Sequence, residues 1–164
     1  MTWLKLLSRK YRTLSGLSAA ERSLLICAVW LLPLVAIALQ IKGLRFTQDL
    51  LLLAFRSRRS NSEPNSEQIW TTVRMVKTAA KYYQPWANCL KKSLVLWILL
   101  RDRGIMSEIR IGIQRESTTF AAHAWVEYQG IVLNDSDDVH QRFQAFDRLF
   151  EQPIEAKPWA ALSA

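Results

Sequence analysis

The sequence has little cysteine and little histidine, two of each in 164 residues, with no Cys-x-x-Cys pair and no cluster at metal-ligand spacing. These shortages argue against a disulfide framework and against a structural zinc site. Cysteine this sparse suits a reducing compartment, so we expect a cytoplasmic protein that needs no metal and no other cofactor.

Glycine and proline are also scarce, at five residues each, whereas half of the chain is hydrophobic and seven residues are Trp. A chain of this length and composition can bury a sizeable core. The composition therefore predicts a compact domain and argues against extended disorder.

Acidic residues are nearly missing from the first part of the chain. Residues 1–60 carry ten basic and two acidic residues, while residues 61–164 carry twelve of each. A basic surface of this kind can meet anionic lipid, nucleic acid or an acidic partner, and an ordinary solvated face explains it equally well. We expect no nucleic-acid partner and leave a membrane surface open.

One apolar run is long enough to raise the question of a membrane. Residues 24–39 form 16 consecutive apolar residues between Arg22 and Lys42. A spanning helix needs about 20 such residues, and Pro33 interrupts this one. We predict a buried core helix, with shallow association at a membrane surface as the alternative.

Apolar periodicity and capping residues predict several helices before any strand. The Ser18-x-x-Glu21 capping box begins a helix over 18–42, a short helix follows over 47–55, and the polar stretch 56–66 reads as a linker. Two further helices are predicted over 69–84 and 89–103, the second with Gly104 after its C-terminus.

The pattern then changes to strands. Residues 109–113 alternate apolar and polar side chains, and 120–127 with 131–134 form a predicted hairpin. Helical spacing returns at Val139, Phe143, Phe146 and Phe150. This order predicts an α+β fold, with a helical, basic N-terminal segment over 1–60 and a catalytic domain with a small antiparallel sheet over 61–164.

Three residues stand where a cysteine-nucleophile triad needs them. Cys89 begins a helix, His123 follows 34 residues later in a strand, and Asp135 lies 12 residues beyond that. A helix N-terminus and a protonated imidazole both stabilise a thiolate. His123 would then protonate a leaving amine, while Asp135 would fix the ring tautomer. Taken singly, each residue has an ordinary structural explanation.

Two further side chains, Gln84 and His140, are candidates for this site. The backbone N–H of Cys89 is a natural oxyanion donor at the first helical turn, and Gln84 is a candidate for the second donor. We favour an ordinary surface role for Gln84. We also favour an exposed position for His140 over a second catalytic histidine.

The hairpin loop decides whether His123 and Asp135 can meet. A two-residue turn at Gln129 and Gly130 would place Asp135 on the opposite sheet face from His123 and break the triad. A three-residue loop starting at Tyr128, with Gly130 left-handed, would place them opposite each other. We therefore predict the three-residue loop.

Four segments carry a more specific pattern: CLKKSLVLW from Cys89, LLRDRGI from Leu99, HAWVE from His123, and LND ending at Asp135. They resemble the transglutaminase-like leader peptidases of lasso-peptide biosynthesis, over roughly residues 69–150. The resemblance implies a transglutaminase-like or papain-like cysteine protease fold. It also implies that Cys89, His123 and Asp135 form the triad.

The resemblance further implies a substrate and partners. Such enzymes cut the leader from a ribosomally made precursor peptide, freeing an amine for an ATP-dependent, asparagine-synthetase-like cyclase. Residues 1–60 show none of the alternating strands that a fused winged-helix recognition domain would need. The chain therefore resembles the split, stand-alone type, which works with a separate PqqD-like leader-recognition protein.

Two other functions stay open. An amide-transferring enzyme of the same fold would share the thioester intermediate and pass the acyl group to an amine. A non-catalytic, membrane-associated scaffold would use residues 24–39 and the basic N-terminal segment.

Overall fold

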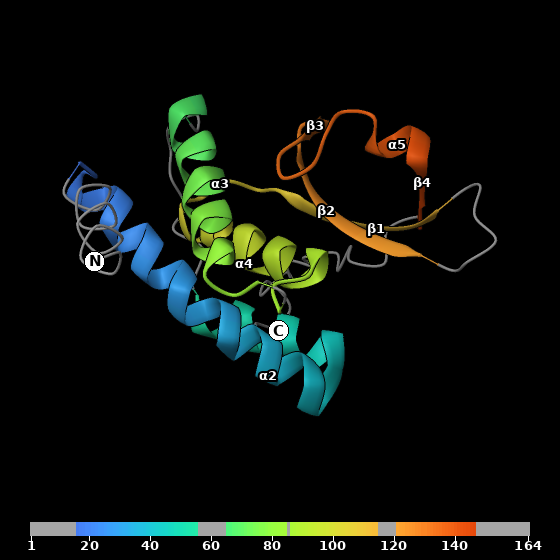
Figure 1. The fold of residues 1–164 in the computed structure, drawn as a ribbon, viewed down its shortest axis with the longest axis horizontal. Helices are drawn as coiled ribbons and strands as arrows, with labels where there is room; N and C mark the ends of the chain where they lie inside the picture. The colour runs from blue at the N-terminus through green and yellow to red at the C-terminus, as the bar shows by residue number, and fades with distance from the viewer. Residues whose placement is uncertain (1–15, 56–64, 85, 115–120, 147–164) are drawn as a thin grey trace, which may run out of the picture.

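The computed structural model describes residues 16–55, 65–84, 86–114 and 121–146. Figure 1 places the three long helices together on one side of the molecule, with the sheet and a short helix on the other. The elements are α2 (Ala19–Ala54), α3 (Ser66–Lys81), α4 (Cys89–Asp102), β1 (Glu108–Gln114), β2 (Ala122–Tyr128), β3 (Ile131–Val132), α5 (Val139–Arg142) and β4 (Phe143–Ala145). The strands form one antiparallel sheet in the order β3-β2-β1-β4. The predicted α+β fold is confirmed.

Helix α2 begins at the predicted capping box and breaks at Gly43, directly after the predicted end of the first helix. The Ser18 hydroxyl accepts from the Glu21 N–H at 3.2 Å, and the Glu21 carboxylate accepts from the Ser18 N–H at 2.8 Å. Gly43 has non-helical angles, φ 78° and ψ −173°. The Thr47 hydroxyl donates to the Gly43 carbonyl at 2.7 Å, so the second helical stretch follows the break directly.

The two faces of α2 differ in burial. One face packs into a core shared with α3, α4 and the sheet, through the buried residues Leu24, Leu25, Ala28, Leu31, Leu32, Val35, Thr47 and Leu51. The opposite face exposes apolar side chains. By length and composition α2 is able to cross a membrane, and 33% of its most apolar window is buried inside the protein. The prediction of a buried core helix therefore holds for one face of α2 only. The predicted domain boundary at residue 60 stays a prediction.

Side-chain caps set the start of α3 and of α4. Asn65 accepts from the Glu67 N–H at 3.0 Å, and Asn88 accepts from the Lys91 N–H at 3.1 Å. Helix α4 ends at Asp102; Gly104 follows with a φ of 78°, which suits glycine, and the Ile105 N–H donates to the Leu100 carbonyl at 3.0 Å. Both termini of α4 are thus fixed by local chemistry.

The predicted C-terminal helix is mostly wrong. Helix α5 has four residues, and Phe143 then adopts extended angles and begins β4, which pairs with β1 at Gly112 and Ala145. Pairing satisfies backbone groups that β1 would otherwise leave at an open edge, and this outweighs the local helical spacing. Phe150 lies outside the described residues.

The predicted three-residue hairpin loop is also wrong. Tyr128 pairs with Ile131, so the turn contains only Gln129 and Gly130, with φ values of 51° and 80°. Two positive φ values match the right-handed twist of the flanking strands.

Candidate active site

Cys89 is the first residue of α4 and is half-buried. Among the described residues, no hydrogen bond uses its backbone N–H, as expected for the first helical turn. The Asn88 cap and the Lys91 ammonium group, which donates to the Trp86 carbonyl at 2.8 Å, fix the backbone around it. The position combines an accessible thiol with an available amide donor.

His123 lies near the start of β2, with 24% of its side chain exposed. Its ring stacks on Phe143 of β4 at 4.8 Å between centroids and 28° between planes, with Trp125 on the same strand face at 6.1 Å. Two aromatic rings therefore restrict the orientation of the imidazole.

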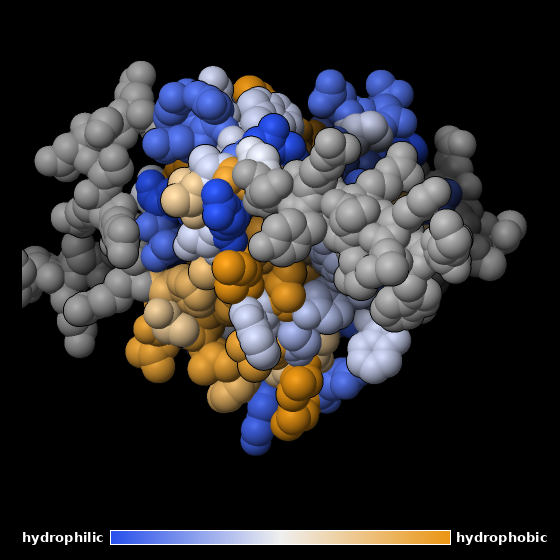
Figure 2. All heavy atoms as spheres, turned by 60° about the vertical axis from the view of Figure 1, so that its left-hand side comes forward, coloured by the Kyte–Doolittle hydropathy of each residue, from blue (hydrophilic) through white to orange (hydrophobic). Residues whose placement is uncertain are grey.

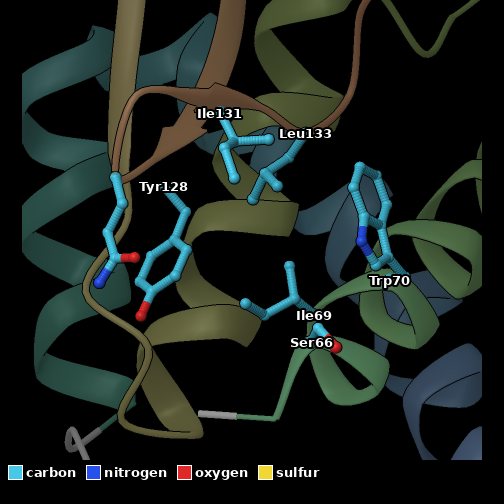
Figure 3. Close-up of a pocket in the computed structure, with 7 residues that line it drawn as sticks. Ser66, Ile69, Trp70, Tyr128, Ile131 and Leu133 are labelled. Atoms are coloured by element: carbon cyan, nitrogen blue, oxygen red, sulfur yellow. The ribbon is translucent and has the colours of Figure 1, made fainter. Parts of the chain in front are cut away.

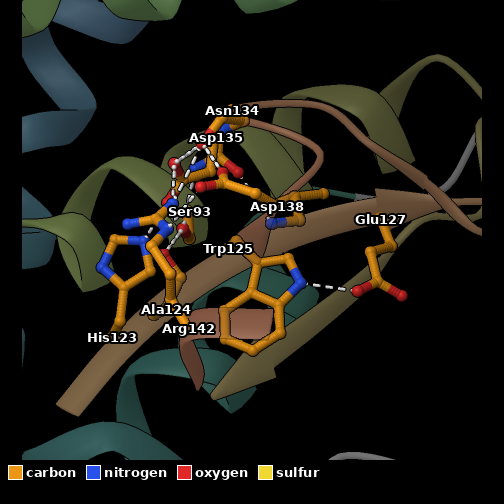
Figure 4. A network of polar contacts seen from close by, with 11 residues as sticks. Ser93, His123, Ala124, Trp125, Glu127, Asn134, Asp135, Asp138 and Arg142 are labelled. Atoms are coloured by element: carbon orange, nitrogen blue, oxygen red, sulfur yellow. Dashed lines mark hydrogen bonds and ion pairs between the residues drawn. The ribbon is translucent and has the colours of Figure 1, made fainter. Parts of the chain in front are cut away.

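Asp135 follows β3 and binds His123 through one carboxylate oxygen. Oδ2 contacts Nε2 of His123, and Oδ1 accepts from the Ser136 N–H at 2.7 Å and from Nη2 of Arg142 at 3.1 Å. Figure 4 shows Arg142 beside this pair. Because Nε2 is used by Asp135, Nδ1 is the ring nitrogen left for a thiol.

The surroundings of Asp135 favour its charged form. Partial burial raises the pKa of Asp135, but the Ser136 N–H, His123 and Arg142 together outweigh burial and hold this pKa below its ordinary value. Asp135 is therefore an anion at neutral pH and can orient the imidazole.

Asn134 explains how a two-residue turn still brings His123 and Asp135 together. The Leu133 N–H donates to the Val126 carbonyl at 2.9 Å, but the Val126 N–H donates to Oδ1 of Asn134 at 2.7 Å. The Asn134 side chain thus takes the place of the Leu133 carbonyl in the ladder. Strand pairing ends there, the backbone turns away, and Asp135 reaches His123. The prediction that this turn breaks the pair is wrong.

A buried hydroxyl connects the sheet to the helix of Cys89. The Ser93 hydroxyl, one turn after Cys89, donates to the Ala124 carbonyl at 3.0 Å and accepts from Nδ2 of Asn134 at 2.9 Å. Ser93 is fully buried. One polar network therefore ties α4 to the residue after His123 and to the residue before Asp135.

The structure brings two of the three predicted residues into contact. His123 and Asp135 are hydrogen-bonded, whereas no hydrogen bond joins Cys89 to His123 within the part of the chain that the structure describes. Catalytic hydrogen bonds are often long without substrate and tighten when substrate binds. Cys89 is the first residue of α4, and α4 packs on β2, the strand that carries His123.

The other two candidate side chains, Gln84 and His140, lie elsewhere. Gln84 is exposed in the turn after α3. His140 has 49% of its side chain exposed and lies 3.3 Å from the buried carboxylate of Glu127. The sequence analysis does not identify Arg142 and predicts a helix at Phe143. A local signal for Arg142 is its spacing of four residues from Asp138, with which it forms an ion pair at 3.1 Å.

A cavity of about 330 Å³ lies at the other end of β2, between the start of α3 and the hairpin turn. Figure 3 shows its lining: Ser66, Ile69, Trp70, Tyr128, Gln129, Ile131 and Leu133. Tyr128 is five residues from His123, roughly 17 Å along an extended strand. The cavity is therefore separate from the His123–Asp135 pair.

Comparison with known proteins gives one match. The family described as the transglutaminase-like superfamily matches residues 31–147, which include α3, α4 and every strand. Neither the curated proteins nor the solved structures contain a match. Within the described residues, no group of three His, Cys, Asp or Glu side chains is arranged to hold a metal ion.

Proposed function

Because the chain belongs to the transglutaminase-like superfamily, we propose that it is a cysteine protease that removes the leader from a ribosomally synthesised lasso-peptide precursor. The superfamily supports cysteine chemistry of the protease or transferase kind, and the sequence segments at Cys89, His123 and Asp135 point to leader removal. The observation that carries the proposal is the hydrogen-bonded pair of His123 and Asp135, on a strand packed against the helix that begins at Cys89.

The proposed reaction has two halves. Nδ1 of His123 takes the Cys89 proton, and the thiolate attacks the scissile carbonyl to form a tetrahedral oxyanion near the backbone N–H of Cys89. The imidazolium then donates its proton to the departing amine, which leaves as the new N-terminus of the core peptide. Water, deprotonated by the same ring, hydrolyses the thioester and releases the leader with a free carboxylate.

Asp135 holds the ring throughout this cycle. Its contact with Nε2 leaves Nδ1 available for the thiol and would stabilise the imidazolium. Arg142 and the Ser136 N–H keep the carboxylate charged and in place, so both are positioning groups.

The proposed partners follow from the resemblance. A PqqD-like recognition protein would present the precursor, and an asparagine-synthetase-like cyclase would consume the freed amine. Delivery by a partner raises the effective concentration of the scissile bond at Cys89. We expect slow cleavage by the chain alone and faster cleavage with the recognition protein.

The test uses a lasso-peptide precursor and a PqqD-like recognition protein, taken from reading frames beside the gene of this chain where these encode them. We expect two products whose masses sum to the precursor plus one water. Cys89→Ala should abolish cleavage, and Cys27→Ala, the same change at an exposed thiol, should leave it intact. Cleavage by the Cys89→Ala protein at the wild-type rate would contradict the proposed nucleophile.

The same experiment separates amide transfer from hydrolysis, since both pass through a thioester. With an added primary amine, a transferase would yield a leader extended by that amine and no gain of water. Products of that kind alone would replace hydrolysis by amide transfer as the function.

A further inference from the structure

The outer face of α2 carries a continuous row of exposed apolar side chains. We call this row the apolar stripe: Ile26, Trp30, Leu34, Ile37 and Ile41, each between 53% and 68% exposed. Spacings of three and four residues place all five on one helical face, over about 22 Å. Figure 2 shows hydrophobic residues gathered on the lower part of the molecule, where Figure 1 places α2.

The stripe contains no charge and is bordered by cations. Residues 23–41 include no acidic or basic side chain, while Arg22 precedes them and Lys42 and Arg45 follow. Of the two acidic residues within 1–60, Glu21 is neutralised by its ion pair with Arg74. An apolar face between cationic ends is complementary to lipid with anionic headgroups.

We propose that α2 docks flat on an anionic membrane surface, with the apolar stripe entering the region between headgroups and acyl chains. Trp30 suits this depth because its ring is apolar with one polar edge. Arg22, Lys42 and Arg45 would contact lipid phosphates at the two ends. This docking does not depend on the chemistry of Cys89.

The contacts of α2 favour lying on the membrane over crossing it. The inner face is tied to the rest of the protein through Leu31, Leu32 and Val35, which are buried, and through the Tyr83 hydroxyl, which donates to the Val29 carbonyl at 2.8 Å. A spanning position would break these contacts or draw α3 into the hydrocarbon. A flat position keeps all of them.

Charge disfavours a second copy of the chain as the occupant. The chain carries a net charge of +8. An antiparallel pairing of two stripes would bring Arg22 of one copy toward Lys42 and Arg45 of the other. Pairing with a second copy would therefore bring like charges together, whereas an anionic surface would attract the same cations.

The test is flotation of the full-length chain with vesicles of phosphatidylcholine alone or mixed equally with phosphatidylglycerol. We expect flotation with the anionic vesicles that falls with added salt. Leu34→Glu, at 58% exposure, should lower the bound fraction by about tenfold, since it places an anion in the stripe. Met106→Glu, at 55% exposure before β1, is the matched control and should change it less than about twofold.

Circular dichroism should show the same helix content for both variants and the wild type, so that lost binding reports on the surface. Failure of the wild type to float with anionic vesicles, or equal flotation of the Leu34→Glu and wild-type proteins, would overturn the proposal. A dimer in light scattering that Leu34→Glu dissociates, without vesicle binding by the wild type, would assign the stripe to a second copy.

Discussion

Asp135 is bound by hydrogen-bond donors that favour its charged form, so we expect its contribution to stability to depend on pH. Because its pKa lies below the ordinary value of about 3.9, ionised Asp135 stabilises the folded state at neutral pH. This contribution is lost as the pH falls from about 4 through the lower, folded-state pKa. Asp135→Asn should therefore lower the free energy of unfolding by about 1–2 kcal/mol at neutral pH, and the difference should shrink in acid.

Urea unfolding at several pH values measures this effect. Asp49→Asn, the same change at an exposed carboxylate on α2, should be nearly neutral throughout. If Asp135→Asn lost stability equally at neutral and strongly acidic pH, the cost would come from geometry and not from charge.

The two thiols provide an internal comparison for the proposed nucleophile. Cys27 is exposed and Cys89 is half-buried, so access alone favours alkylation of Cys27. If His123 stabilises the Cys89 thiolate, Cys89 should react faster with iodoacetamide in mildly acidic buffer. His123→Ala should slow Cys89 by about tenfold and leave Cys27 unchanged.

Peptide mass spectrometry with time gives both rates in one sample. The Phe143→Leu protein is a useful intermediate, because it removes the ring stacked on His123 and keeps the imidazole. If His123→Ala left the alkylation rate of Cys89 unchanged, the imidazole would have no role in activating the thiol.

At the scale of elements, Gly112 joins the strands on both sides of β1. It pairs with His123 of β2 and with Ala145 of β4. A Cβ at this position would lie 2.7 Å from the Gln144 carbonyl oxygen and 3.1 Å from the Trp125 ring. Because the nearest atom belongs to the Gln144 backbone and cannot move away as a flexible side chain could, Gly112→Ala should displace β4.

The displacement should reach the site, since β4 carries the ring that stacks on His123. We expect Gly112→Ala to cost about 2 kcal/mol of unfolding free energy and to slow Cys89 alkylation. Gly130→Ala is the control: its Cβ meets nothing within 4 Å, so only its φ of 80° is strained, at about 1 kcal/mol. Equal alkylation rates in the two variants would show that β4 does not position His123.

The elements also show how far sequence reasoning reaches. The capping box at Ser18, the break at Gly43 and the cap at Gly104 were predictable because each depends on neighbouring residues. The strand at Phe143 was not, since it exists through pairing with β1, about 30 residues away. The contact of His123 with Asp135 was predicted from the wrong loop, because a side chain of Asn134 standing in for a backbone carbonyl leaves no periodic signal.

At the scale of the whole molecule, α2 belongs to the same core as α3 and α4, and the family match begins inside it at residue 31. A chain beginning at residue 61 would lose the eight buried residues of α2. Each fully buried large apolar side chain stabilises by about 1.5–3 kcal/mol, so the loss would approach or exceed a typical total stability of about 5–15 kcal/mol.

We therefore expect the 61–164 chain to unfold without a cooperative transition in urea and to bind a hydrophobic dye, because the faces of α3 and α4 that α2 covers would be open to water. A chain beginning at residue 16 keeps every buried residue named for α2 and should unfold cooperatively, near the midpoint of the full-length protein. Circular dichroism during titration measures both. Cooperative unfolding of the 61–164 chain would instead make residue 60 a true domain boundary, with α2 an attached segment that the catalytic domain does not need for folding.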